Sequence, residues 1–225
     1  IPKRYIRAHF FEGPLRVSAL RSLGAYANIF AIESFMDELA ELAGADPLDF
    51  RIAHSDDERA IAVLEKLREL TAGQPTGDDE GIGYGFSRYK NSAAYCGVAA
   101  RVRVDPGSSA VRLQQLWAAI DAGEVINPEG LRNQTEGGML QSASWTLMEG
   151  VGFDAKHITT LNWPAYPILR FPDTPQQIEV AIIDRPDQPC LGAGEAAQGP
   201  TAAAIANAVY WASGKRIRDL PIRKE

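Results

Sequence analysis

The residues best suited to chemistry in this chain lie in a glycine-rich stretch, 190–200, which reads CLGAGEAAQGP. Gly192 and Gly194 permit backbone conformations and close approaches that residues with a side chain cannot adopt. Glu195 follows them, at the point where an Ala-rich run indicates a helix. Because free N–H groups at a helix N-terminus bind anions, this glycine turn (190–195) could hold a phosphate-bearing cofactor or position a catalytic acid.

The spacing Gly192-x-Gly194-x-x-Ala197 also satisfies a relaxed dinucleotide-binding fingerprint. In a Rossmann fold such a turn follows directly from a buried strand. Here the best strand candidate, 178–183, is separated from the glycines by an Asp- and Pro-rich stretch, and no second strand with a ribose-binding acid follows. We therefore keep the glycine turn and reject the Rossmann fold.

A second pair of glycines, Gly137 and Gly138, lies inside a predicted helix at 129–148. Each glycine costs a helix about 1 kcal/mol relative to alanine, so the pair needs a reason. Close approach of a ligand and tight packing of another backbone explain it equally well.

Composition limits the classes of function. The chain has 225 residues, of which 45% are hydrophobic, enough for one large domain or two small ones. A formal net charge of −6 without a block of Lys and Arg argues against nucleic-acid binding, and no apolar run is long enough to span a bilayer. The two cysteines and three histidines are too scattered for a metal or iron–sulfur spacing, so Cys96 and Cys190 are expected to be buried free thiols.

Periodicity and turn signals predict the elements that must position these residues. Helices are predicted at 25–43, 47–51, 57–70, 129–148 and 200–213, and strands at 3–11, 82–91, 93–104, 111–119 and 178–183. Asp46 is expected to cap the second helix, and Gly214 to end the last. Proline-broken aromatic loops are expected at 162–167 and 171–175.

The first predicted helix has an apolar side, which we expect to face the core, and Asp37 lies on the opposite side. The apolar side consists of Ile29, Phe30, Ile32, Phe35, Met36, Leu39 and Leu42. A polar stretch at 71–81 is the best internal boundary. We therefore divide the chain into an N-terminal strand and helical segment (1–72), a connector (73–84) and an α+β portion (85–225), which 1–72 could also continue as one domain.

Three blocks in this order resemble the molybdenum hydroxylase family, to which xanthine oxidase and aldehyde oxidoreductase belong. They are LRSLG with NIFAIESFMDELA at 20–40, DAG with NP and QTEGG at 121–138, and GAGE with AIANA at 192–208. The resemblance is strongest to the molybdopterin-binding large subunit of isoquinoline 1-oxidoreductase and its nicotinate- and aldehyde-oxidising relatives. It spans nearly the whole chain, implies an α+β fold of mixed sheets with packed amphipathic helices, and corresponds to the C-terminal part of a longer subunit. Since the first residue is Ile1, we expect a processed product or a piece of something larger.

The resemblance implies a subunit that binds molybdenum through a pterin, often as the cytosine dinucleotide, and hydroxylates a carbon with water as the oxygen source. Glu195 would be the general base, with a pKa raised by apolar surroundings. The residues that would line the cofactor are Gln134, Gly137, Gly138, Leu191, Gly192, Ala193 and Gly194. Arg21 would orient substrate or cofactor, although a charge pair with the helix of Glu33 explains it nearly as well.

This sequence departs from the xanthine-oxidising members at Leu23 and at residues 24–28, which favours a smaller N-heteroaromatic or aldehyde substrate. The chain lacks the cysteine clusters of an iron–sulfur site, so an iron–sulfur partner subunit is implied, together with the remainder of the large subunit. The isolated chain is expected to be inactive. The alternative is a cofactor-binding or assembly module that has lost turnover, in which Glu195 serves only the helix dipole.

Overall fold

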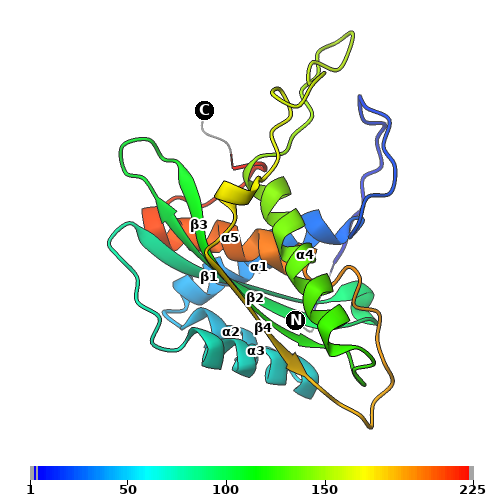
Figure 1. The fold of residues 1–225 in the computed structure, drawn as a ribbon, viewed down its shortest axis with the longest axis vertical. Coiled ribbons are helices and arrows are strands. Elements are labelled where there is room, and N and C mark those ends of the chain that lie inside the picture. The colour runs from blue at the N-terminus through cyan, green and yellow to red at the C-terminus, as the bar shows by residue number, and fades with distance from the viewer. Residues whose placement is uncertain (1–2, 4, 223–225) are drawn as a thin grey trace.

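The centre of the fold is a mixed four-stranded sheet, in a computed structural model that describes residue 3 and residues 5–222. Its strands, in spatial order, are β1 (Glu80–Arg88), β2 (Tyr95–Val104), β3 (Val111–Asp121) and β4 (Gln177–Ile183). β1, β2 and β3 pair antiparallel, and β4 pairs parallel to β3. The α+β expectation is confirmed (Figure 1).

The helices are α1 (Ala25–Leu42), α2 (Pro47–Ala53), α3 (Glu58–Thr71), α4 (Pro128–Leu147) and α5 (Gln198–Ser213). The predicted cap of α2 is confirmed, because Asp46 accepts from the first backbone N–H groups of that helix, and Asp57 caps α3 in the same way. Each such cap typically contributes about 1 kcal/mol. Gly214 ends α5 with a left-handed φ of 72°.

Both faces of the sheet are covered, because alternate residues of β2 and β3 enter two separate cores. On one face, Ala99 and Trp117 pack with apolar side chains of α3, among them Val63, Leu64 and Leu67. On the other face, Val98 and Ala118 belong to a core with residues of α4 and α5, among them Met139, Ala204, Ile205 and Ala208. The sheet is thus the middle layer between two helical layers (Figure 1).

α5 lies unusually close to β1, because β1 presents glycine at every second position. A Cβ at Gly83 would stand 2.1 Å from the backbone nitrogen of Ala208, and Gly81 and Gly85 are equally confined by α5. The Ala-rich helix therefore fits directly against bare strand backbone. This contact fixes the N-terminus of α5, and with it Glu195, beside the end of β1.

α1 forms where predicted, but the face assigned to the core is only partly right: Phe30 is buried, while other members of that face are exposed. Ile32 and Phe35 are each 55% exposed, whereas Asp37 is fully buried. The reason is a buried ion-pair network, in which Arg216 donates to Asp37 at 2.7 Å and Arg51 donates to Glu33 at 2.8 Å. These arginines compensate the cost of burying the two carboxylates.

The predicted strand at 3–11 is also wrong, because residue 3 and residues 5–11 adopt no regular structure; residue 4 lies outside the described residues. Their alternating aromatic residues have no neighbouring strand to pair with, so Phe10 and Phe11 remain 96% and 87% exposed. This N-terminal arm (5–20) and the long loop 149–176, which holds the expected proline-broken segments, project from the body of the fold (Figure 1). The division of the chain at 73–84 stays a prediction.

Candidate functional site

Glu195 stands at the entrance to α5, and both oxygens of its carboxylate accept hydrogen bonds. Oε1 accepts from the backbone N–H of Ser22 at 2.8 Å, and Oε2 accepts from the Tyr89 hydroxyl at 2.7 Å. Ser22 belongs to the segment before α1 and has a positive φ of 77°. Tyr89 begins the 3-10 segment Tyr89–Asn91 at the end of β1. Three distant parts of the chain therefore meet at one side chain.

These contacts change the expected acidity of Glu195. The hydrogen bond from Tyr89 and then that from the Ser22 N–H lower the pKa of Glu195, and together they outweigh the opposing effect of burial. The positive charges of Lys90 and Arg21 lower this pKa further. The expectation that apolar surroundings raise the pKa of Glu195 is therefore wrong for this chain, and the carboxylate is ionised at neutral pH.

The backbone carbonyl of Gly194 is the point where the other predicted side chains converge. Arg21 Nε donates to it at 2.8 Å, and Gln134 Nε2 donates to it at 3.1 Å. The guanidinium of Arg21 also reaches the side chain of Gln141 at 3.1 Å. Burial lowers the pKa of Arg21, and the nearby charge of Glu195 partly offsets this. The acidic residues of α1 pair with other arginines, such as Glu33 with Arg51, Asp37 with Arg216 and Glu38 with Arg218, so the alternative charge pair between Arg21 and this helix is wrong.

The first turn of α5 contributes a further amide, that of Gln198, which is completely buried. In the orientation that satisfies both of its ends, its nitrogen donates to the backbone oxygen of Glu195 at 3.1 Å. Its oxygen then accepts from Arg21 Nε at 2.6 Å. Gln198 thereby ties Arg21 to the backbone of the catalytic candidate.

The rest of the glycine turn is held by the ends of two strands. The N–H of Leu191 donates to the carbonyl of Ala122 at 2.7 Å, and the carbonyl of Gly192 accepts from Ala94 at 3.1 Å. Ala193 packs partly buried against the core. Gly192 itself is exposed, and no described atom beyond its chain neighbours lies within 4 Å of where its Cβ would stand.

The paired glycines of α4 have two different environments. Gly138 is buried, and a Cβ there would stand 3.2 Å from the Cβ of Ala197, so it serves helix packing. Gly137 is exposed, and outside its own helix no described atom lies within 4 Å of the corresponding position. Helix packing therefore accounts for Gly138. The backbone at Gly137 is uncovered, so the explanation by a ligand stays open for that residue.

The cysteine expectation holds for only one of the two thiols. Cys96 is buried, and its burial raises its thiol pKa to about 12, whereas Cys190 is exposed. Within the described residues, no three His, Cys, Asp or Glu side chains form a group that could hold a metal ion. Over the same part of the chain, no helix is long and apolar enough to cross a membrane.

Comparison with known proteins decides the family. A family model described as a molybdopterin cofactor-binding domain matches residues 18–175, which include Arg21, Gln134 and both glycines of α4. The chain belongs to the molybdenum hydroxylase family. The resemblance inferred from the three sequence blocks is confirmed.

Two relatives and one solved structure place this molybdenum hydroxylase domain within larger proteins. One subunit of the nicotinate dehydrogenase of Pseudomonas putida is 39% identical, over 94% of this chain and 19% of that protein. The beta subunit of isoquinoline 1-oxidoreductase from Brevundimonas diminuta is 31% identical, over 99% of this chain and 29% of that protein. The aldehyde oxidoreductase of Desulfovibrio gigas shares the fold, with a TM-score of 0.77 at 17% identity over 91% of this chain and 40% of that one. The chain thus spans less than a third of the length of the first two relatives.

The fold of the molybdenum hydroxylase domain brings Arg21, Gln134, Gly194 and Glu195 into one hydrogen-bonded cluster. Sequence reasoning missed the groups that complete the cluster, which are Ser22, Tyr89, Gln141 and Gln198. Gln141 and Gln198 are polar residues within otherwise small or apolar helical runs, which was the signal available for them. No local pattern marks Ser22 or Tyr89.

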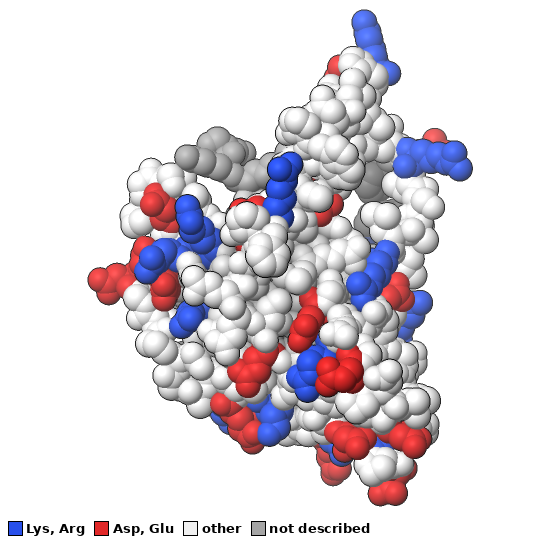
Figure 2. All heavy atoms as spheres, viewed as in Figure 1, with Lys and Arg blue, Asp and Glu red and all other residues white. Residues whose placement is uncertain are grey.

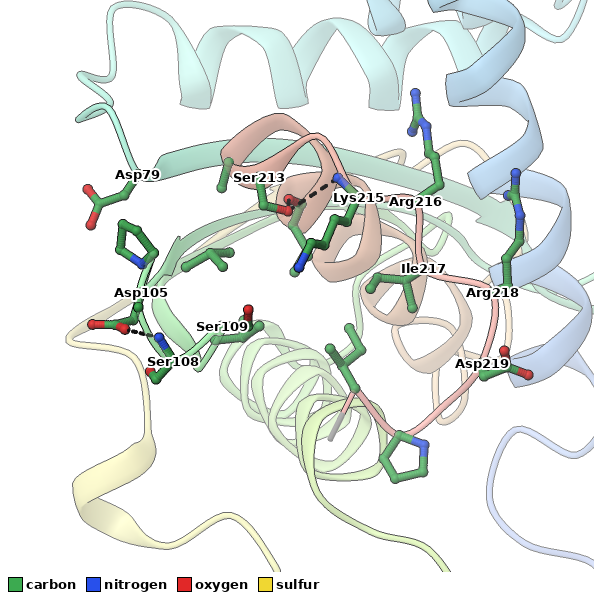
Figure 3. A pocket seen from close by; sticks show the side chains of 18 of the residues that line it. Asp79, Asp105, Ser108, Ser109, Ser213, Lys215, Arg216, Ile217, Arg218 and Asp219 are labelled. Atoms are coloured by element: carbon green, nitrogen blue, oxygen red, sulfur yellow. Dashed lines mark hydrogen bonds between the residues drawn. The ribbon is translucent and has the colours of Figure 1, made fainter. Parts of the chain in front are cut away.

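A cavity of about 1060 Å³ lies away from this cluster, at the opposite end of α5. It is lined by the turn between β2 and β3 and by the segment that follows α5, including Ser108, Ser109 and Lys215 (Figure 3). Two of its cations have acidic partners outside it, because Arg216 pairs with Asp37 and Arg218 pairs with Glu38. None of the predicted site residues lines this cavity, so it is separate from the candidate active site.

Proposed function

We propose that this domain carries the general base of a molybdenum-dependent oxidoreductase that hydroxylates a carbon of a small organic substrate. The observation that carries the proposal is the carboxylate of Glu195, held ionised by two donors beside the exposed Gly192 and Gly194 and next to Arg21. A general base must be deprotonated and fixed within reach of the proton that it takes. Two hydrogen bonds fix the Glu195 carboxylate and favour its ionised form, which supports this role.

The open backbone around Glu195 fits a bulky, phosphate-bearing cofactor. Gly192 and Gly137 leave free space where a Cβ would stand, and Gln134 and Arg21 provide hydrogen-bonding groups between them. We propose that these residues, with Leu191, Ala193 and Gly194, would hold molybdopterin, in its cytosine dinucleotide form. When bound, that group supplies the molybdenum redox chemistry. Mass analysis of the nucleotide released from the complete complex by acid would identify the dinucleotide form.

The role of the protein residues follows from their contacts. Each carboxylate oxygen of Glu195 has about two acceptor positions. Ser22 and Tyr89 each occupy one, which leaves one position on each oxygen for an incoming proton. Arg21 fixes the backbone at Gly194, immediately before the base, and so helps to set the position of the Glu195 side chain. Glu195 would thus take a proton without having to change its orientation.

The relatives support a proposal for the substrate class. Their names refer to nicotinate, isoquinoline and aldehydes, which are N-heteroaromatic compounds or small carbonyl compounds. We propose that the complete enzyme acts on an N-heteroaromatic or aldehyde carbon, with water as the oxygen source. Activity assays with one substrate of each class would decide between them.

We also propose that the domain works only with the remainder of the large subunit and with an iron–sulfur subunit. Both relatives are subunits of larger enzymes, and the two cysteines of this chain are fewer than the four that a cluster usually needs. Large apolar side chains are exposed on the projecting segments, where a neighbour could cover them: Tyr5, Ile6, Phe10, Phe11, Leu161, Trp163 and Phe171. The projecting loop at the top of Figure 2 is mostly uncharged surface.

The proposal is tested by Glu195→Gln in the complete complex. We expect turnover to fall by about 10²–10⁴-fold, the usual worth of a general base, with the molybdenum content unchanged. Glu129→Gln, an exposed residue in the first turn of α4, is the matched control and should keep its activity. Near-parental turnover of Glu195→Gln would show that Glu195 is not the base.

The isolated 225-residue chain should contain no stable cofactor and show no activity, because we propose that the remainder of the large subunit completes the pocket. Expression with competent cofactor synthesis, followed by metal and pterin analysis, measures this directly. Stoichiometric pterin on the isolated chain would contradict the proposal.

A further inference from the structure

Tyr89 contacts the candidate base from a part of the chain that no sequence motif marks. Tyr89 is only 6% exposed, and its hydroxyl lies 2.7 Å from Oε2 of Glu195, 106 positions along the chain. Its backbone is fixed as well, because its N–H donates to Ala94 and its carbonyl accepts from Ala93. The hydroxyl is therefore presented to Glu195 from a rigid support.

We propose that Tyr89 is a positioning residue for Glu195, which orients the carboxylate and keeps it ionised as the acceptor of a proton. The inference rests on the proposed function, because it requires Glu195 to be the base. Ser22 holds the other oxygen through its backbone, which a side-chain substitution does not remove. Tyr89 is thus the one of these two donors that a mutation can delete.

The Tyr89 hydroxyl stays the donor of this hydrogen bond over the working range of pH. Burial, then the hydrogen bond to Glu195 and the negative charge of that residue, raise the pKa of Tyr89 to about 12. The phenol therefore remains protonated at every pH at which an enzyme is assayed. A hydrogen bond to an ionised acceptor is about twice as strong as one between neutral groups, so it favours the ionised form of Glu195.

The other charged groups that act on Glu195 are few. Lys90 follows Tyr89 in the chain, with its ammonium 5.2 Å from the centre of the Tyr89 ring, and Arg21 approaches from the segment before α1. Both cations also favour the carboxylate. Among the described groups that lower the pKa of Glu195, however, Tyr89 has the largest effect.

Removing the hydroxyl should therefore change the pH dependence of the reaction. Without this donor, the Glu195 carboxylate binds a proton more readily, and a protonated base cannot accept another. The acid limb of the kcat/KM profile should move to higher pH in Tyr89→Phe, while the rate on the alkaline side of that limb changes less. On the acid limb itself we expect a loss of at least about tenfold, the worth of one hydrogen bond to a charged group.

The control is Tyr95→Phe in the complete complex. Tyr95 is a buried tyrosine whose hydroxyl also donates to a carboxylate, that of Asp57 at 2.9 Å, but it does not contact Glu195. Its removal should leave the acid limb in place. A second test of sign replaces Tyr89 by 3-fluorotyrosine, a more acidic phenol and so a stronger donor, which should move the acid limb to lower pH.

A readout without turnover separates this inference from the proposed function. Infrared titration of the labelled Glu195 carboxyl, assigned by its loss in Glu195→Gln, should show a higher midpoint in Tyr89→Phe than in the parent complex. An unchanged midpoint together with an unchanged acid limb overturns the role of Tyr89. A raised midpoint in a protein whose Glu195→Gln variant keeps full turnover overturns the proposed function instead.

Discussion

Arg21 and Gly194 are 173 positions apart, yet the Nε of Arg21 lies 2.8 Å from the carbonyl oxygen of Gly194. This hydrogen bond ties the segment before α1 to the turn before α5. The same carbonyl accepts from Gln134 on α4, so three elements are joined at one backbone atom. The position of Glu195, the next residue, depends on this junction.

Arg21→Lys should loosen the junction. A lysine carries one flexible ammonium and cannot reproduce the planar fork that reaches Gly194, Gln141 and the Gln134 backbone together. We expect a loss of about 1–2 kcal/mol in the free energy of unfolding, measured by urea denaturation of the chain. Arg68→Lys, at an exposed ion pair with Asp49, is the control and should change stability by less than about 0.5 kcal/mol. Equal stability of Arg21→Lys and the parent would mean that the junction contributes nothing.

The glycines of α4 should respond in opposite ways to the same substitution. Gly137→Ala adds a methyl group to open space on a helix and should stabilise the chain by up to about 1 kcal/mol, as judged by thermal unfolding. Gly138→Ala must displace Ala197 or Gln198 and should cancel or reverse that gain. If Gly137 faces the cofactor as proposed, Gly137→Ala should also lower the molybdenum content of the complete complex. Full occupancy in that variant would remove Gly137 from the cofactor site.

The glycines of β1 should tolerate no side chain. A Cβ at Gly83 would stand 2.1 Å from the backbone of α5, and neither backbone can move without disturbing a core. We expect Gly83→Ala to cost about 1–3 kcal/mol or more in the free energy of unfolding. Gly77→Ala, where the nearest atom is 3.7 Å away, is the matched control in the connector. A Gly83→Ala variant as stable as this control would show that α5 does not pack as closely as described.

Sequence reasoning succeeded where the signal was local. Capping by Asp46 and the stop at Gly214 each depend on a few adjacent residues, and both are confirmed. The glycines at 81, 83 and 85 also carry a local signal, since glycine at alternate positions of a strand indicates close approach of another backbone.

The failures have a common physical cause, which is pairing over long distances in the chain. The buried face of α1 follows Arg216, 179 positions from Asp37, rather than its own apolar pattern. The pKa of Glu195 depends on the hydrogen bonds from Tyr89 and from the N–H of Ser22. Ser22 has a positive φ, and a serine at this position does not predict that backbone conformation. Such pairs exist only in the folded chain, where these distant segments meet.

The Asp121 network provides a prediction about pH and stability. Asp121 is fully buried at the end of β3 and accepts hydrogen bonds from Arg59, Arg185 and the N–H of Gly123. Burial raises the pKa of Asp121, but these donors outweigh it and hold the pKa below its usual value of 3.8. A carboxyl whose pKa is lower in the folded state stabilises the fold above its unfolded pKa, and that stabilisation is lost as the pH falls through the folded pKa.

Asp121→Asn should therefore be less stable than the parent at neutral pH, and the difference should shrink as the pH falls below about 4. Urea denaturation of both proteins at a series of pH values measures the two free energies of unfolding. Asp187→Asn is the control, because Asp187 is exposed and its substitution should change the free energy of unfolding by less than about 0.5 kcal/mol. A difference between parent and Asp121→Asn that stays constant down to about pH 3 would mean that Asp121 keeps its usual pKa in the fold, and that the two arginines merely lie nearby without favouring its ionised form.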